Sequence, residues 1–119
     1  MTTSTATRIA AAFGLLAVAL GAFGAHGLRD LLGHNGTLGI WEKAVFYHFI
    51  HALMLFILAE RNQLPKVAWW SFFVGILIFS GSLYLLAVTN LHWLGMITPV
   101  GGAAFIIGWC CLIFCKRRA

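Results

Sequence analysis

Two histidines three residues apart, His48 and His51, lie inside a long apolar stretch and are the residues of this chain best placed to do chemistry. A helix that enters a membrane at Trp41 places His48 about 10 Å deep and His51 about 15 Å deep, near the bilayer centre. Because residues three apart share a helix face, both rings meet the same neighbours. Ionisable residues inside a span mark a functional site by default, so His51 is the first candidate.

Most of the remaining polarity of the apolar segments falls in the same half of the membrane as His51. Pro99 cannot donate a hydrogen bond to the carbonyl of Gly95, which predicts either a kink or a free acceptor there. An antiparallel arrangement brings hydroxyl groups from two further segments to this half. The candidate polar site comprises His26, Glu42, Tyr47, His51, Ser80, Ser82, Tyr84, Thr98 and Pro99.

The residues leave two interpretations of this site open. In the first, a neutral histidine donates to a hydroxyl or a carbonyl and locks two helices together. Such bonds average about 0.6 kcal/mol but fix the helix register. In the second, His51 titrates within a small transporter or proton relay, with Ser82, Tyr84 and Thr98 as its hydrogen-bond partners. The cytoplasmic half offers only Ser71 and thiols to such a path, which weighs against permeation.

The positions of the histidines disfavour a haem or zinc site. Haem held inside a bundle takes its ligands from facing helices, whereas His48 and His51 share one helix. The second ligand would be His26 or His92, both near the surface. Zinc held by His26, His48 and His51 lacks a clear fourth ligand. We expect no metal and no cofactor, with a haem or quinone protein as the third alternative.

The elements that position these residues must be membrane helices. Of 119 residues, 61% are hydrophobic and 9% are charged, whereas an average soluble domain is about 25% charged. Each of four apolar windows is near the roughly 20 residues that a spanning helix needs. Backbone in lipid must satisfy its own polar groups, so these windows are helices. The predicted fold is an all-α polytopic transmembrane four-helix bundle, a single domain of residues 1–119 with spans at about 9–28, 41–59, 67–88 and 94–115.

The connector between the first two spans is the longest and has a pattern of its own. Leucines alternate there with Arg29 and Asp30, which predicts a short helix lying in the membrane interface. Glycines then interrupt it, and Thr37 is the predicted N-cap of the second span.

Basic residues concentrate on one side of the predicted bundle. The opposite side holds only Arg29 and Lys43 of the 8 Lys and Arg residues. The positive-inside rule then predicts both termini in the cytoplasm and a multi-pass protein of the inner (cytoplasmic) membrane. We therefore interpret the net charge of +5 as a set of topology signals that also face anionic lipid headgroups, and not as a nucleic-acid-binding surface. The residues on the predicted cytoplasmic side are Arg8, Arg61, Lys66, Lys116, Arg117 and Arg118.

The N-terminal span has a competing interpretation as a signal peptide. Arg8 followed by an apolar run fits such a peptide, with cleavage after Ala25. Phe23 would then occupy the position three before the cut, where a small residue is wanted. We therefore expect the first span to be retained.

Small residues recur at helical spacing and predict faces for close helix packing. This spacing does not distinguish a neighbouring span from a second copy of the chain. The predicted packing residues are Ala17, Gly21, Ala25, Gly75, Gly101, Gly102 and Gly108.

Three cysteines crowd the end of the fourth span. Cys110, Cys111 and Cys115 lack the paired spacing of a zinc site and form no disulfide framework. We expect free thiols, with palmitoylation as the alternative.

Several strings of the sequence together resemble one family. They are Gly21-Ala-Phe-Gly-Ala-His-Gly-Leu28, Trp41-Glu-Lys-Ala-Val-Phe-Tyr47 with His51-Ala-Leu53, Phe79-Ser-Gly-Ser-Leu-Tyr84, and Ile97-Thr-Pro-Val-Gly-Gly102 with Gly108-Trp109. In order and spacing, over nearly the whole chain, they resemble the uncharacterised small bacterial inner-membrane proteins of the YgdD/YwdK type, which have eukaryotic relatives. The resemblance implies a four-span membrane protein without an established biochemical function.

Carried over position by position, the resemblance highlights the nine residues of the candidate polar site. His48 departs from the family pattern, which commonly has Gln there, and His92 is particular to this chain. We expect a protein without enzymatic chemistry that acts in the lipid bilayer as an accessory or interaction partner, in a homo-oligomer or a larger membrane complex.

Overall fold

The computed structural model describes residues 2–115, and helices make up nearly all of this part of the chain. Four helical units within it are long and apolar enough to cross a membrane, and a short helix joins the first two. This confirms the predicted all-α fold with four spans and a connecting helix. The basic residues Lys116, Arg117 and Arg118 lie outside the described residues. The elements are α1 (Thr3–Ala25), α2 (Arg29–Asn35), α3 (Leu38–Ala59), α4 (Lys66–Gly75), the π-helix η1 (Ile76–Ser80), α5 (Gly81–Thr89), the 3₁₀-helix η2 (His92–Met96) and α6 (Thr98–Phe114).

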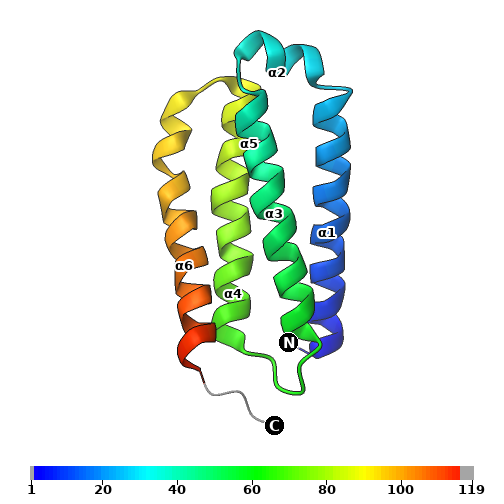
Figure 1. Cartoon of the computed structure of the whole chain (residues 1–119), viewed down its shortest axis with the longest axis vertical. Coiled ribbons are helices and arrows are strands. Elements are labelled where there is room, and N and C mark those ends of the chain that lie inside the picture. Colours follow the sequence, from blue (N-terminus) through cyan, green and yellow to red (C-terminus); the bar gives the residue numbers. More distant parts are fainter. Residues whose placement is uncertain (1, 116–119) are drawn as a thin grey trace.

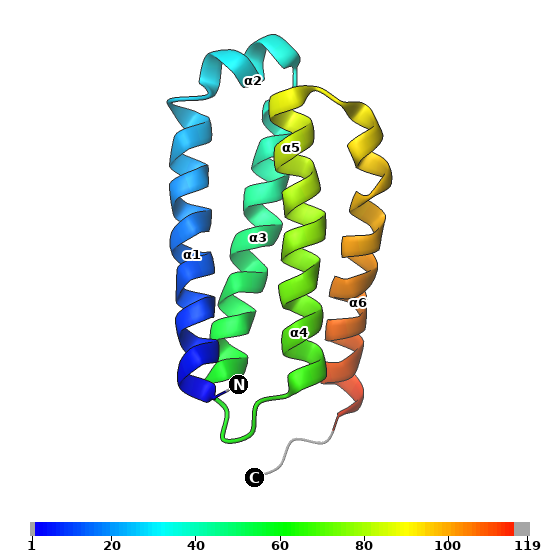
Figure 2. The same cartoon turned by 180° about the vertical axis from the view of Figure 1, so that it is seen from behind.

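Helix α3 and the continuous rod formed by α4, η1 and α5 make the centre of the molecule (Figures 1 and 2). Helix α1 packs mainly on α3, and α6 packs mainly on α4 and η1, so α1 and α6 form the two outer edges. The N-terminus, the connector 60–65 and the end of α6 share one end of the bundle, named here the basic end. Helix α2 and the turn after α5 cover the other, the α2 end.

The first helix is longer at its start than the apolar window predicted. It begins at Thr3 instead of residue 9, because the Thr2 hydroxyl accepts a hydrogen bond from the amide of Thr5 at 3.1 Å and caps the helix. It ends at Ala25, and the next residues turn into α2 instead of extending the span to residue 28.

Thr37 stands at the N-cap position of α3 but does not cap it with its side chain. Its hydroxyl donates instead to the carbonyl of Ala87 at 2.7 Å, and the Asn35 amide donates to the same carbonyl at 3.1 Å. The last carbonyls of a helix have no partner within it, so these bonds satisfy the end of α5. Gly36, with φ +69, makes the left-handed turn that ends α2 and directs both side chains there.

Pro99 marks a break in the fourth span. The 3₁₀-helix η2 ends at Met96, α6 begins at Thr98, and Pro99 stands in the first turn of α6. A helix leaves its first N–H groups unpaired, so a proline there costs no intrahelical bond. The predicted kink is thus the start of a new helix.

The apolar core has two parts, one towards each end of the bundle. The larger lies towards the basic end and joins all four spans, and the smaller lies under α2. Along α3, the segment from Ala44 to His51, which carries both intramembrane histidines, falls between them. The buried residues of the larger part are Ala6, Ala10, Leu55, Leu58, Ala59, Ala68, Trp69, Phe72, Ile76 and Phe105, and those of the smaller are Leu32, Trp41 and Ala87.

Three of the predicted packing glycines stand at close contacts between α6 and the central rod. A Cβ added at Gly101 would lie 2.7 Å from Cα of Phe79, and one at Gly108 would lie 2.5 Å from the Phe72 ring. Gly75 likewise meets the ring of Phe105. The adjacent Gly102 has room, since its Cβ would come no closer than 3.8 Å to Phe79.

The packing face of α1 differs from the predicted one at its end. Ala17 is buried and Gly21 faces Val45, but Ala25 is exposed. The buried residue there is Gly24, whose missing side chain leaves room for the indole of Trp41.

Candidate polar site between the spans

The His51 ring is hydrogen-bonded through both of its nitrogens. Nδ1 lies 2.8 Å from the carbonyl oxygen of Tyr47, and Nε2 accepts the indole N–H of Trp109 at 3.1 Å. A carbonyl only accepts and an indole N–H only donates, so Nδ1 carries the proton and Nε2 does not. The ring stacks on Phe105 with 3.7 Å between centroids and is 4% exposed. The structure therefore holds a neutral imidazole of defined tautomer.

Helix spacing on α6 explains this arrangement. Trp109 follows Phe105 by four residues, so both side chains project from one face towards α3. On the neighbouring rod, Phe72 packs against both His51 and Trp109, with centroids 5.3 and 5.1 Å away. The bare backbone of Gly108 leaves the space for the Phe72 ring. A small residue thus positions the aromatic cage around His51.

His48, one turn earlier on α3, makes a separate polar pair. Its Nδ1 lies 2.8 Å from the hydroxyl of Tyr84 on α5, and its ring is 2% exposed. The Tyr84 ring packs on Trp41 at 4.7 Å, and the Trp41 indole donates to the carbonyl of Leu20 on α1 at 2.9 Å. These contacts connect α5, α3 and α1 in a row.

The serines of the candidate site bond to two different helices. Ser80 donates to the carbonyl of Ala44 on α3 at 2.8 Å, whereas the Ser82 hydroxyl lies 2.6 Å from that of Thr98 on α6. The π-helix η1 ends at Ser80 and was not predicted. A π-turn adds one residue and rotates the rest of the span by about 100° relative to an unbroken α-helix. A helix face predicted from regular α-helical spacing before η1 therefore does not continue on the same side of the span after it.

The remaining predicted residues lie outside these pairs. His26 is exposed just after α1, and Glu42 and Pro99 are exposed on their helices. Tyr47 is 37% exposed and contributes its carbonyl to His51. His92 bonds to the side chain of its neighbour Asn90 at 2.8 Å. The predicted site is thus several separate pairs rather than one cluster.

The hydrogen bonds differ from those predicted for a relay. Within residues 2–115, no hydrogen bond joins His51 to Ser82, Tyr84 or Thr98. In the same residues, no fully buried side-chain nitrogen or oxygen lacks a partner, and no three His, Cys, Asp or Glu side chains are grouped to hold a metal. The described cysteines Cys110, Cys111 and Cys115 are free.

Sequence reasoning missed Trp109 as the partner of His51. One signal was present, because an indole N–H inside an apolar span needs an acceptor. The same rule applies to Trp41 and to Trp69, which donates to the carbonyl of Leu55 at 3.2 Å. Tryptophans within the apolar spans were therefore the best available pointers to interhelical bonds.

Comparisons with known proteins agree with the family resemblance. The model of a protein family described as "protein of unknown function (DUF423)" matches residues 20–102. The UPF0382 membrane protein YwdK of Bacillus subtilis is 49% identical over 105 residues, which cover 83% of this chain and 85% of that protein. A UPF0382 membrane protein of Staphylococcus epidermidis is 45% identical over 108 residues, covering 87% of this chain and 88% of that protein.

A third relative, UPF0382 membrane protein SAB0533 of Staphylococcus aureus, is 46% identical over 103 residues, or 83% of this chain and 84% of that protein. No solved structure matches the chain significantly. The matched residues include the helices that carry His48, His51, Ser80 and Ser82. The chain therefore belongs to the DUF423/UPF0382 family of membrane proteins, whose function is unknown.

Proposed function

We propose that this protein is a non-enzymatic accessory or interaction protein of the cytoplasmic membrane, and that its intramembrane histidines lock helices together. A single observation carries the proposal: the buried polar side chains of the described residues are paired with one another or with backbone from another helix. Such pairing fixes the register of a bundle. The side-chain pairs are His51 with Trp109, His48 with Tyr84, and Ser82 with Thr98.

The bonds of His51 support a lock over a proton relay. A relay needs a group that can pass its proton on to a hydroxyl, a carboxyl or water. The neighbours of the His51 nitrogens are a backbone carbonyl and an indole N–H, and neither is a proton carrier. Three prominent pockets of residues 2–115 are lined by neither His48 nor His51. This arrangement argues against a path through His51.

The outer helices supply surfaces through which such a protein would act. Leu15 and Val18 of α1 are 73% and 59% exposed, and Ile106 and Ile113 of α6 are 64% and 72% exposed. In a bilayer these side chains meet lipid, a second copy or another membrane protein. The two edges lie on opposite sides of the central pair, so both are open to contacts in the membrane plane.

The orientation in the membrane forms part of the proposal. The described basic residues Arg8, Arg61 and Lys66 lie at or near the basic end, whereas Arg29 and Lys43 lie near the α2 end. Under the positive-inside rule, this distribution supports both termini in the cytoplasm.

Reconstitution into liposomes separates the lock from the relay. Wild-type protein and His51→Ala would be placed in vesicles loaded with a pH-sensitive dye, and an imposed pH gradient would be followed. A lock predicts no proton flux above protein-free vesicles for either protein, together with a lower Tm for His51→Ala in detergent. Flux in the wild type that His51→Ala abolishes without changing the Tm would overturn the proposal. A Soret band after expression with haem supply would favour the haem alternative.

A further inference from the structure

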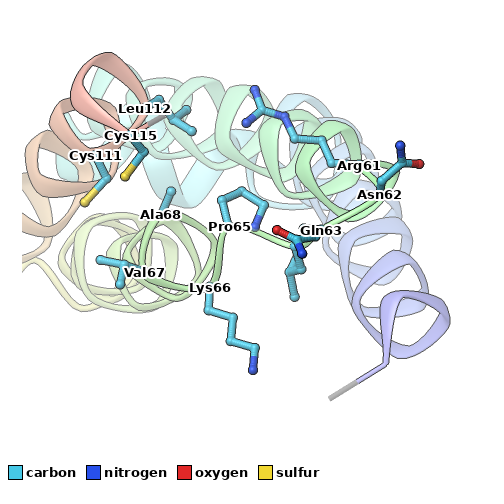
Figure 3. Close-up of a pocket in the computed structure, with 11 residues that line it drawn as sticks. Arg61, Asn62, Gln63, Pro65, Lys66, Val67, Ala68, Cys111, Leu112 and Cys115 are labelled. Atoms are coloured by element: carbon cyan, nitrogen blue, oxygen red, sulfur yellow. The ribbon is translucent and has the colours of Figure 1, made fainter. Parts of the chain in front are cut away.

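A pocket opens at the basic end between the connector, the start of α4 and the last turn of α6 (Figure 3). Its volume is about 370 Å³. Arg61 and Lys66 are its basic residues, and their side chains extend to opposite sides in Figure 3, while Ala68 and Leu112 supply an apolar wall. The pocket lies where a bilayer has its headgroups, since α4 begins at Lys66 and α6 ends at Phe114.

A groove lies beside this pocket, between α4 and α6. Lys66 and Val67 line both the pocket and the groove, so the two hollows adjoin. From Val67 to Val74 the groove extends about 10 Å along α4. The short side chains of Ser71 and Ala104 leave the hollow, and the lining is otherwise mostly apolar.

The described charged residues that line this composite site, Arg61 and Lys66, are both basic. The nearest acidic residue in sequence, Glu60, accepts a hydrogen bond from Thr7 of α1 at 3.1 Å. Glu60 lines a neighbouring hollow to which Arg61 also contributes, but it lines neither the pocket nor the groove.

We propose that the pocket and groove together bind one anionic phospholipid from the leaflet at the basic end. The phosphate lies in the pocket, where the long side chains of Arg61 and Lys66 turn towards it, and one acyl chain lies in the groove over Ser71 and Ala104. Lysine and arginine near a membrane surface attract anionic lipids. A free phosphate would use the pocket alone, whereas a phospholipid uses the polar pocket and the apolar groove at once. The two hollows adjoin at Lys66 and Val67, and this position favours the lipid.

Native mass spectrometry of the full chain in mild detergent tests this proposal. The protein would be mixed with equal amounts of phosphatidylglycerol and phosphatidylcholine, and bound lipids would be counted. The wild type should retain phosphatidylglycerol preferentially. The double variant Arg61→Gln/Lys66→Gln should bind it on the order of tenfold more weakly, with phosphatidylcholine unchanged. Arg8→Gln is the control for the single variants Arg61→Gln and Lys66→Gln, since each removes one charge and Arg8 lines neither the pocket nor the groove.

A second variant tests the groove without changing any charge. Ala104→Phe fills the groove and should lower phosphatidylglycerol binding while Arg61 and Lys66 remain. Circular dichroism and the Tm of each variant establish that it is folded. Equal losses for Arg8→Gln, Arg61→Gln and Lys66→Gln would overturn the proposal, since the effect would then be net charge. Full binding by Ala104→Phe, with competition by inorganic phosphate, would assign the pocket to free anions and also overturn it.

Discussion

The indole N–H of Trp109 donates to Nε2 of His51 across 3.1 Å, and this bond ties α6 to α3. The two helices are not main packing partners, because α6 packs chiefly on α4 and η1. Large side chains bridge the distance: Phe105 stacks on His51 at 3.7 Å, and Trp109 supplies the polar contact. The outer helix α6 is therefore tied to α3 by an aromatic bridge with one hydrogen bond in it.

Trp109→Phe removes the donor of this bridge and keeps an aromatic ring. We expect a loss of about 0.6 kcal/mol of unfolding free energy, and no more than about 2 kcal/mol, the range for interhelical hydrogen bonds in membranes. Equilibrium unfolding in mixed micelles measures it. Trp70→Phe is the control, because Trp70 is 44% exposed on the groove side of α4. Equal losses for the two variants would mean that the bond to His51 contributes nothing.

Replacing His48 tests its bond to Tyr84. A glutamine can donate to or accept from the Tyr84 hydroxyl, so His48→Gln should keep the stability within about 0.5 kcal/mol. His48→Leu leaves the hydroxyl without its partner and should cost about 1 kcal/mol or more. A double-mutant cycle with Tyr84→Phe isolates the interaction, since Leu and Phe together remove both polar groups. A coupling energy of zero would show that the two side chains only pack.

Gly101 and Gly102 are adjacent on α6 and form a matched pair. A Cβ at Gly101 meets the backbone of Phe79, which cannot move aside, so Gly101→Ala should cost about 1–3 kcal/mol. Gly102→Ala has room at 3.8 Å and should be neutral or slightly stabilising, since alanine favours helix. Thermal unfolding in detergent compares them. If the two variants unfold at the same temperature, α6 is able to shift away from η1 at little cost in stability.

The number of spans could be predicted from the sequence, because lipid requires about 20 apolar residues and an internally bonded backbone. The connecting helix was likewise predictable from its alternation of leucine and charge. The start of α1 was not, since Thr3 and its neighbours are polar and only the cap at Thr2 shows where the helix begins. Composition defines the part of a helix that lies in lipid, and caps define its ends.

Hydrogen-bond partners were less predictable than spans. Proximity of His51 to Ser82 or Thr98 was inferred from depth alone, but depth says nothing about which face a residue occupies. The π-helix η1 changes the phase of the third span just before Ser82, and its sequence carries no clear mark of that change. On α1 the buried packing residue is Gly24 instead of Ala25, because the Trp41 ring inserts there. This is a tertiary contact that residue spacing cannot specify.

The orientation of the bundle is testable with one cysteine at each end. In a background with Cys110, Cys111 and Cys115 replaced by serine, Gln63→Cys would report on the basic end and His34→Cys on the α2 end, since both residues are exposed. An impermeant maleimide should label His34→Cys in intact cells. It should label Gln63→Cys only after lysis, because the positive-inside rule retains basic connectors in the cytoplasm.

Removing basic residues tests whether they determine the orientation of the protein in the membrane. Replacing Arg8, Arg61 and Lys66 with serine leaves the described part of the basic end without Lys or Arg, while Arg29 and Lys43 remain near the α2 end. If these three residues set the orientation, a fraction of the molecules should invert, and Gln63→Cys should then become accessible in intact cells. Unchanged labelling would assign the orientation to Lys116, Arg117 and Arg118 instead, and serine at those three positions would then produce the inversion. Labelling of Gln63→Cys in intact cells before any charge is changed would contradict the proposed topology itself.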